Sequence, residues 1–239
     1  MLTSPGGVLL LDKPKGWTSF DCVAKLRRRL GVQKIGHAGT LDPFATGVLI
    51  LLIGRQFTSM ADSLQGMDKS YWMQVRLGQS TDTFDSEGKV VGESEIQPTL
   101  EQLQAALGHF QGEVEQIPPM FSAKKVNGQK LYHLARRGIE LERAPVLIRL
   151  CTQLIRYEYP FVELQIDCSK GSYMRTIAQD LGELLGCGAH AAELTRTRCG
   201  PFRLTDCLAG SSLTDEECDL AAYLKQEVPS AASCHDWNI

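Results

Sequence analysis

The sequence lacks the cysteine pairs and histidine spacings that build disulfide frameworks and zinc sites. Its eight cysteines include no Cys-x-x-Cys pair, and no histidine follows one of them at a metal-ligand spacing. Reduced thiols are the default for such a chain and indicate a cytoplasmic protein. No apolar run approaches the ~18 residues that a membrane span needs, and the N-terminus shows no basic leader with a small-residue cleavage site. We therefore expect neither a membrane anchor nor a secretory signal.

Several catalytic signatures are missing as well. The chain has no Gly-x-x-x-x-Gly-Lys-Ser/Thr loop and no Gly-x-Gly-x-x-Gly fingerprint, so nucleotide cofactors lack their usual cradle. No Gly-x-Ser-x-Gly elbow is present, and the five histidines are scattered singly. These absences argue against nucleotide-dependent enzymes, serine hydrolases and metal sites.

Positive charge is not in excess, since the formal net charge is −3, but it is unevenly placed. Residues 1–40 contain seven lysines and arginines against two aspartates, and a second basic cluster occupies 124–143. Two basic segments on a mildly acidic chain favour a phosphate-rich partner on one face. A set of solvated helix faces explains the same charges, and the sequence leaves both interpretations open.

The most informative stretch runs from Gly36 to Gly47 and places one carboxylate, Asp42, between glycines and directly before a proline. Pro43 fixes its own φ and keeps Asp42 out of helical space, while glycines let the backbone approach a ligand closely. The apolar run 48–53 that follows is typical of a buried strand. A polar loop anchored to the core often carries function. An ordinary Asp-Pro turn entering a core strand would look the same.

Strand patterns outnumber helix patterns along the chain, and turns often join neighbouring strands. This arrangement predicts an α+β fold, a mixed and largely antiparallel sheet flanked by helices. We expect strands at 8–11, 48–53, 71–77, 146–157, 161–168 and 192–198. We expect helices at 19–30 with Ser19 as its N-cap, at 99–111, from 172 to 185, and an acidic helix near 214–224.

Three features capable of chemistry remain: Asp42 in its loop, Tyr71 at the head of a strand, and a helix start with Tyr173 and Arg175. A guanidinium keeps a neighbouring carboxylate ionised and fixes its orientation. An aromatic face holds a flat heterocycle by stacking. Together these groups would form a pocket for a nucleobase sugar, with Asp42 attacking or deprotonating the ribose. Spacing alone does not establish that they meet in space.

The stretch from Gly36 to Leu49 closely resembles the signature of the TruB-type tRNA pseudouridine synthases. Other segments resemble further motifs of the family in the right order: Asp12–Gly16, Lys69–Tyr71, Gln116–Lys124, Gly171–Arg175 and Leu194–Thr197. The resemblance covers the chain from about Gly7 to Phe202.

The resemblance implies the pseudouridine synthase fold and the activity of a tRNA pseudouridine-55 synthase, an isomerase that needs neither cofactor nor metal. Such enzymes break the N-glycosidic bond of uridine 55, turn the uracil and rejoin it through C5. The uridine must first be flipped out of the T loop. The implied partner is the T stem-loop of tRNA, with no obligate protein partner, so a monomer is expected.

Carried over by position, the resemblance makes Asp42 the catalytic carboxylate, with Arg175 as its ion-pair partner and Tyr71 stacking on the base and helping to remove the C5 proton. Whether Asp42 adds to the ribose C1′ or takes the C2′ proton stays open. The expected substrate-binding residues are His37, which would fill the space that the base leaves, Leu194, which would line the pocket, and Tyr173, Lys13, Asp85 and Lys124. For Asp85, an ordinary Asp turn is an equal alternative.

The chain departs from the family pattern at two positions and at its end. Thr195 stands where arginine is common, and Phe44 where leucine is usual. Members usually carry a compact RNA-binding domain after the catalytic one, but only 37 residues follow Phe202 here, too few for a full PUA domain. We expect a catalytic domain at 1–202, which carries most of the RNA binding, and a short extension at 203–239.

Two other functions remain open. A non-catalytic RNA-binding or tRNA-folding module on the same scaffold would keep the basic segments and would not depend on Asp42. A carboxylate-based glycosidase would require a second acid near Asp42, for which Asp85 is the candidate.

Overall fold

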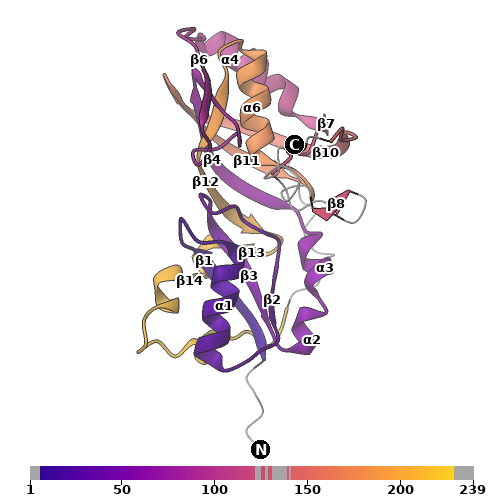
Figure 1. The fold of residues 1–239 in the computed structure, drawn as a ribbon, viewed down its shortest axis with the longest axis vertical. Helices are drawn as coiled ribbons and strands as arrows, with labels where there is room; N and C mark the ends of the chain where they lie inside the picture. The colour runs from indigo at the N-terminus through magenta and orange to yellow at the C-terminus, as the bar shows by residue number, and fades with distance from the viewer. Residues whose placement is uncertain (1–5, 122–124, 127–128, 131–138, 140, 229–239) are drawn as a thin grey trace, which may run out of the picture. The chain divides into compact units, whose positions relative to one another are not determined.

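The computed structural model describes residues 6–121, 125–126, 129–130, 139 and 141–228. They belong to two compact units (Figure 1). Unit 1 combines Met1–Tyr71 with Leu194–Ile239, and unit 2 is Trp72–Glu193. Two long strands, β4 (Lys69–Leu77) and β12 (Ala189–Cys199), contribute residues to both units.

Unit 1 is organised around β3, which pairs antiparallel with β1 along one edge. On its other edge, β3 pairs antiparallel with β2 at one end and parallel with β12 at the other. The remaining elements are short helices and strands of the two chain segments. The elements of this unit besides β4 and β12 are β1 (Gly7–Lys13), α1 (Ser19–Leu30), β2 (Ile35–Ala38), β3 (Thr46–Ile53), α2 (Arg55–Thr58), α3 (Ala61–Gln65), β13 (Phe202–Arg203), η2 (Leu204–Asp206), β14 (Leu208–Ala209), η3 (Gly210–Leu213) and η4 (Leu220–Tyr223).

Strand β3 is buried on both faces, which explains its unbroken apolar sequence. Val48, Ile50 and Leu52 belong to a cluster that includes Phe57 of α2 and Leu64 of α3. The alternate side chains of the strand point to the opposite face and are also fully buried. Because neither face of the strand contacts solvent, apolar residues are favoured at every position and do not alternate with polar ones. The loop that precedes β3 is therefore attached to a strand that is buried on both faces.

Helix α1 has a capping residue at each end, and both residue types are typical of these positions. Thr18 is the N-cap and forms a capping box with Asp21, and Gly31 closes the helix at a φ of 66°. The prediction of Ser19 as the N-cap is wrong by one residue. Ser19 is the first residue of the helix, and its hydroxyl bonds instead to the backbone of Leu41.

The described part of the C-terminal segment packs into unit 1. Strand β14 pairs parallel with β1, and Lys225 exchanges two backbone hydrogen bonds with Val8. Arg29 of α1 donates from its guanidinium to the carbonyls of Asp215, at 2.5 Å, and Cys218, at 2.7 Å. The guanidinium of Arg29 therefore holds this segment against α1 within unit 1.

The prediction of an acidic helix near 214–224 is wrong. Residues 214–224 contain one 3₁₀ turn, η4, and no α-helix, and the preceding 3₁₀ turn, η3, ends at Leu213. Asp215 and Asp219 each accept a hydrogen bond from the backbone amide two residues later. Such local bonds compete with helical hydrogen bonding and favour turns.

Unit 2 contains the strand order β4-β11-β10-β7, with β10 antiparallel to both of its neighbours. Helix α4 packs against β10 and α6. The remaining elements are hairpins and turns. The elements of this unit besides β4 and β12 are β5 (Gln79–Thr81), β6 (Val90–Glu93), α4 (Leu100–Leu107), η1 (Gly108–Phe110), β7 (Gly112–Gln116), β8 (Lys125–Val126), β9 (Gln129–Lys130), β10 (Val146–Glu158), β11 (Phe161–Cys168) and α6 (Met174–Leu184). Most of the strand pairs described above are antiparallel, whereas β14 and β12 pair in parallel with β1 and β3, so the expected α+β class with a mixed sheet is confirmed.

Candidate active site

The loop between β2 and β3 carries Asp42, and its backbone is tied down on both sides of that residue. Before it, the Leu41 amide donates to the Ser19 hydroxyl at 2.9 Å, and the same hydroxyl lies 3.2 Å from the Leu41 carbonyl. After it, the Pro43 carbonyl accepts from the Gly16 amide at 2.8 Å. Asp42 is half-buried while both of its neighbours are held. The loop thus presents its single carboxylate from a fixed backbone.

Lys13 supports the same loop from inside the core. The side chain is fully buried at 0% exposure. Its ammonium donates to the carbonyls of Trp17 at 2.6 Å, Pro14 at 2.9 Å and Pro43 at 3.2 Å. A buried charge needs such hydrogen bonds to offset its lost hydration. The structure therefore brings Lys13 to the backbone that follows Asp42.

His37 lies on β2, just before the loop, and is half-buried. Its Nδ1 is buried and has no hydrogen-bond partner among the described residues. Burial first, and the positive charge of Arg196 second, lower the pKa of His37 below its usual value. The imidazole is therefore neutral at neutral pH, which suits an aromatic ring that stacks on a base.

Tyr71 and Leu194 are the other predicted site residues of unit 1. Tyr71 lies on β4 and is 7% exposed, and Leu194 lies on β12 and is 5% exposed. The residue after Leu194, Thr195, shares a hydroxyl–hydroxyl hydrogen bond of 2.8 Å with Thr46 at the start of β3. Leu194 is thus anchored next to the exit of the Asp42 loop.

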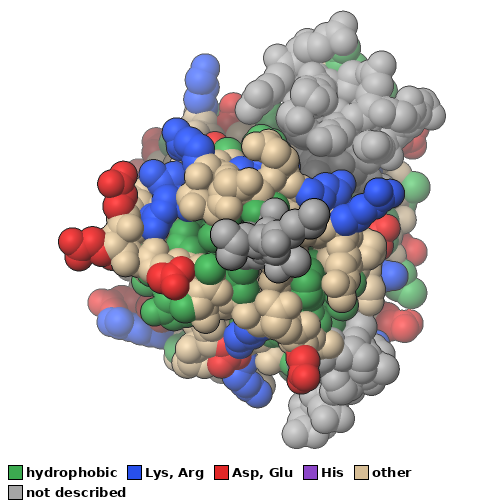
Figure 2. All heavy atoms as spheres, turned by 90° about the horizontal axis from the view of Figure 1, so that it is seen from below, with side chains coloured by type: hydrophobic (Ala, Val, Ile, Leu, Met, Phe, Trp, Pro, Cys, Tyr) green, Lys and Arg blue, Asp and Glu red, His purple; other side chains and the backbone are tan. Residues whose placement is uncertain are grey.

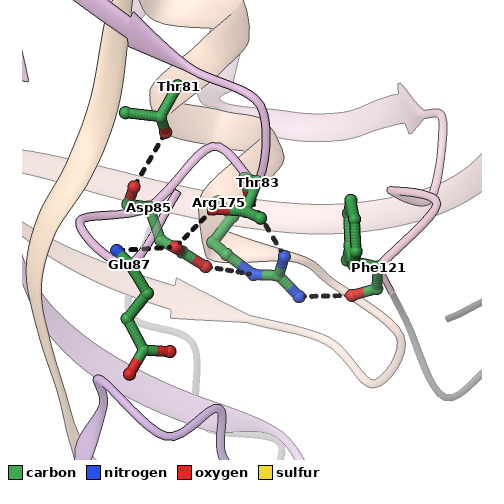
Figure 3. A network of polar contacts seen from close by, with 6 residues as sticks. All are labelled: Thr81, Thr83, Asp85, Glu87, Phe121 and Arg175. Carbon is green, nitrogen blue, oxygen red and sulfur yellow. Dashed lines mark hydrogen bonds and ion pairs between the residues drawn. The ribbon is translucent and has the colours of Figure 1, made fainter. Parts of the chain in front are cut away.

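Arg175 stands at the start of α6 in unit 2 and is 4% exposed (Figure 3). Its guanidinium donates to the carbonyls of Phe121 at 2.6 Å and Thr83 at 3.0 Å. Its Nε lies 3.6 Å from Oδ2 of Asp85, an ion pair whose side chains are both almost completely buried. Three groups of the protein thus fix the plane and position of the guanidinium.

Asp85 is oriented in turn by the acidic turn that contains it (Figure 3). Its Oδ1 accepts from the Thr83 hydroxyl at 2.6 Å and from the Glu87 amide at 3.1 Å. Its own carbonyl accepts from the Thr81 hydroxyl at 2.7 Å. The Asp85 side chain is 6% exposed. The structure therefore gives Asp85 a buried position beside Arg175, and the expected contact of Asp85 with RNA stays a prediction.

Gln116 holds the start of the helix that carries Arg175. Its side chain is 4% exposed and bonds to both backbone groups of Tyr173: the Tyr173 amide donates to Oε1 at 2.7 Å, and Nε2 donates to the Tyr173 carbonyl at 3.0 Å. Tyr173 is the N-cap of α6 and makes no side-chain cap of its own. The Gln116 side chain thus gives the Tyr173 amide, which has no partner within the helix, an acceptor, and adds a second donor to the Tyr173 carbonyl, which also accepts from the Ile177 amide.

The predicted site residues fall into two groups. Unit 1 contains Asp42, Tyr71, His37, Leu194 and Lys13, and unit 2 contains Arg175, Asp85 and Tyr173. Lys124 lies outside the described residues. The predicted pairing of Asp42 with Arg175 joins one residue of each unit and stays a prediction.

Three supporting residues are not among the predicted site residues: Ser19, Gln116 and Arg196. Serine is common at helix caps, and this is the role that the sequence predicts for Ser19, while Gln116 has no local signal beyond its place in a motif. Arg196 follows Leu194 by two positions in a strand, so it shares the face of a buried leucine. An arginine on an inward face is the signal that would have singled it out, because a buried charge requires partners.

Gly47 offers a sharp test of how tightly the loop exit is packed. Its φ is 101°, and a Cβ at this position would lie 2.3 Å from the carbonyl oxygen of Arg196. Gly47→Ala is therefore expected to lower the free energy of unfolding by at least about 2 kcal/mol, measured by denaturant titration. Gly36→Ala is the matched control in the same unit, because its Cβ would meet Thr58 at an ordinary 3.6 Å. Equal stability of the two variants would contradict the packing described here.

The raised pKa of Asp180 on α6 should make the stability of the folded protein depend on pH. Burial first, and the charge of Glu183 second, raise the pKa of its carboxyl from 3.8 to about 6. The folded protein binds this proton more tightly than the unfolded chain does, so stability falls as the pH rises from about 4 to 6. In the Asp180→Asn variant the side chain cannot ionise, so this decrease in stability with rising pH should disappear. The variant should melt like the wild type at pH 4 and at a higher temperature than the wild type above pH 6; a difference independent of pH would refute the assignment.

Basic side chains are available on the surface, mixed with acidic ones. On the face drawn in Figure 2, Lys and Arg side chains are interspersed with Asp and Glu, and apolar side chains lie between them. Exposed basic residues of the N-terminal segment include Lys15, Arg28 and Lys34.

Within the described residues, no group of three or more His, Cys, Asp or Glu side chains has the geometry to hold a metal ion. Every helix in the described part of the chain is too short or too polar to traverse a lipid bilayer.

Comparison with family models covers most of the chain. A model described as "TruB family pseudouridylate synthase (N terminal domain)" matches residues 27–174, and one described as "tRNA pseudouridylate synthase B C-terminal domain" matches residues 175–228. The chain is 56% identical over 207 residues to a protein of Protochlamydia amoebophila named tRNA pseudouridine synthase B, covering 87% of this chain and 79% of that protein. A protein of the same name from Chlamydia abortus is 51% identical over 219 residues, covering 92% of this chain and 93% of that protein.

Solved structures share the fold. A chain of a "Cbf5-Nop10-Gar1 Complex" superposes with a TM-score of 0.69 at 28% identity, covering 87% of this chain and 54% of that one. A chain of an "H/ACA RNP bound to a substrate RNA containing 2'-deoxyuridine" gives a TM-score of 0.65 at 25% identity, covering 87% and 52%. This chain spans about half the length of these two solved chains.

Proposed function

Because the chain belongs to the TruB family of pseudouridylate synthases, we propose that it converts uridine 55 in the T loop of tRNA to pseudouridine, with Asp42 as the catalytic carboxylate. That it is an isomerase making pseudouridine in tRNA follows from the relatives of that name, which match over most of their length. The choice of uridine 55 and the role of Asp42 are the finer parts of the proposal. We further propose that it acts as a monomer in the cytoplasm.

The observation that carries the proposal is the anchoring of the Asp42 loop. Leu41 and Pro43 are each held by hydrogen bonds to α1 or to the segment before it, while Asp42 itself is half-buried. A carboxylate on a fixed backbone keeps its orientation when a substrate arrives, which lowers the entropy cost of reaching the reactive geometry. An ordinary Asp-Pro turn requires no such support from both sides.

The reaction rearranges bonds within one nucleotide. The C1′–N1 bond breaks, the uracil turns and a C1′–C5 bond forms, so that C5 loses a proton and N1 gains one. Asp42 either adds to C1′ as the uracil leaves and is displaced when C5 attacks C1′, or removes the C2′ proton and returns it to C2′ when the C1′–C5 bond forms. We assign Tyr71 the stacking contact with the base and a part in removing the C5 proton. No external reductant or energy source is needed, because atoms and electrons balance within the nucleotide.

Arg175 is proposed as the counter-charge of Asp42. An arginine stays protonated at any physiological pH, and its bonds to Asp85, Thr83 and Phe121 keep the guanidinium in one orientation. A guanidinium held in one orientation would hydrogen-bond the Asp42 carboxylate and fix the direction in which it faces the ribose. Asp85 is then a positioning residue, which acts on Asp42 through Arg175.

Binding of the tRNA is assigned to groups in and around the loop. The neutral ring of His37 would stack in the space left by the flipped uridine, and Leu194 would line the pocket. Exposed basic side chains such as Arg28 and Lys34 would contact phosphates of the T stem-loop. The full burial of Lys13 supports a role in holding the loop more than a direct contact with RNA. One solved structural relative is described with a substrate RNA bound, which agrees with RNA as the partner.

The choice of uridine is tested with an unmodified tRNA transcript whose uridines carry tritium at C5. Isomerisation of a single uridine releases one tritium per tRNA into water, and a transcript with cytidine at position 55 should release none. Equal release from the two transcripts would show that another uridine is the target. Absence of release from both, with tRNA bound, would favour the non-catalytic RNA-binding module.

A further inference from the structure

Arg196 is a buried arginine of unit 1 that the proposed reaction does not yet use. It lies on β12, is 1% exposed, and stands among the largest fully buried side chains of the described residues. Burying a guanidinium is unfavourable unless its N–H donors are hydrogen-bonded. The hydrogen-bond partners of Arg196 therefore indicate its role.

The partners of Arg196 lie at the two ends of the Asp42 loop. Its Nε donates to the carbonyl of Val48 at 2.7 Å, just after the loop. Its two terminal nitrogens donate to the carbonyls of Gly39, at 3.0 Å, and Thr40, at 3.4 Å, just before Asp42. The guanidinium is planar, and its donors point in fixed directions. One side chain therefore sets the separation between the entry and the exit of the loop.

The backbone of β12 reinforces this connection. Arg196 pairs in parallel register with Gly47, which approaches so closely that a side chain at that position would overlap the Arg196 backbone. The neighbouring pair, Thr46 and Thr195, is joined by a hydrogen bond between the two hydroxyl groups. Strand β12 thus contacts the loop exit through main chain and side chains together.

We propose that Arg196 is a positioning residue for the isomerisation, which holds the backbone on both sides of Asp42 in its reactive conformation without contacting the RNA. The proposal rests on the assignment of Asp42 as the catalytic carboxylate. Lysine could not replace this arginine, because a single ammonium on a flexible stem cannot reach carbonyls at both ends of the loop in one geometry. A loop shifted by about 1 Å would present Asp42 incorrectly and slow the reaction by on the order of 10²-fold.

The test compares Arg196→Lys and Arg196→Ala with Arg29→Ala. Arg29 is the matched control in the same unit, because its guanidinium also donates to backbone carbonyls but holds the C-terminal segment instead of the loop. For each variant, the single-turnover rate with unmodified tRNA, the Kd for that tRNA and the folded fraction are measured. Arg196→Lys should lose about 10- to 100-fold in rate per folded molecule, with a Kd within about threefold of the wild type. Arg29→Ala should lower the melting temperature and leave that rate within about threefold.

The outcomes separate this proposal from the catalytic role of Asp42. If Asp42→Asn is inactive and Arg196→Lys turns over at the wild-type rate, the positioning role is refuted and the catalytic carboxylate stands. If Asp42→Asn retains the wild-type rate, the proposed function itself fails. Failure of both Arg196 variants to fold would also overturn the proposal, in favour of a purely structural arginine.

Discussion

Asp42→Asn is expected to abolish pseudouridine formation while leaving tRNA binding intact. The amide has the shape of the carboxylate but can neither add to C1′ nor accept a proton efficiently. The single-turnover rate should fall by at least about 10³-fold, as it does when other enzymes lose a catalytic carboxylate. The backbone bonds of Leu41 and Pro43 do not involve this side chain, so the loop should keep its conformation. Rate and Kd are measured with the same unmodified transcript.

Asp62→Asn is the control for this prediction. Asp62 is exposed on α3 in the same unit and undergoes the same chemical change away from the loop. It should retain the wild-type rate. An Asp42→Asn rate within tenfold of the control would show that this carboxylate does not carry the reaction, and would favour a scaffold that binds tRNA without modifying it.

Arg175→Met should cost both stability and activity. It removes the guanidinium and leaves Asp85 buried without its positive partner, in a site where both side chains are almost fully enclosed. Breaking a buried pair in this way typically costs about 3–5 kcal/mol, measurable as a lower free energy of unfolding in urea. Activity should fall as well, because Asp42 would lose its proposed counter-charge.

The double variant Arg175→Met with Asp85→Asn separates the two effects. Neutralising Asp85 removes the uncompensated charge, so much of the lost stability should return. The rate should stay low, because no guanidinium is restored. Recovery of the rate together with stability would show that Arg175 serves the fold alone and would remove it from the proposed site.

Local sequence patterns predicted the elements that support the site. The apolar run after Gly47 predicted β3. The prediction was reliable because a strand that is buried on both faces is apolar at nearly every position. The helix at 19–30 followed from its apolar spacing and its closing Gly31. The predicted acidic helix near 214–224 failed because aspartates at 215 and 219 bond locally to the backbone, and hydrophobic spacing does not register such bonds.

The partners of the site residues could not be predicted, because they come together only through tertiary folding. Asp85 and Arg175 are separated by a sheet, a helix and several turns, so their pairing has no local signal. The bonds from Arg196 to Gly39 and Val48 cross an even longer stretch of chain. The motifs predicted the site residues, whereas only the folded structure shows which groups hold them in place.

The most direct measurement is a crystal structure of the Asp42→Asn variant bound to unmodified tRNA. Uridine 55 should be turned out of the T loop, with its ribose C1′ and C2′ beside residue 42, its base against Tyr71, and the Arg175 guanidinium next to residue 42. A uridine 55 still stacked inside the T loop, or a ribose held away from residue 42, would contradict the proposed role of Asp42.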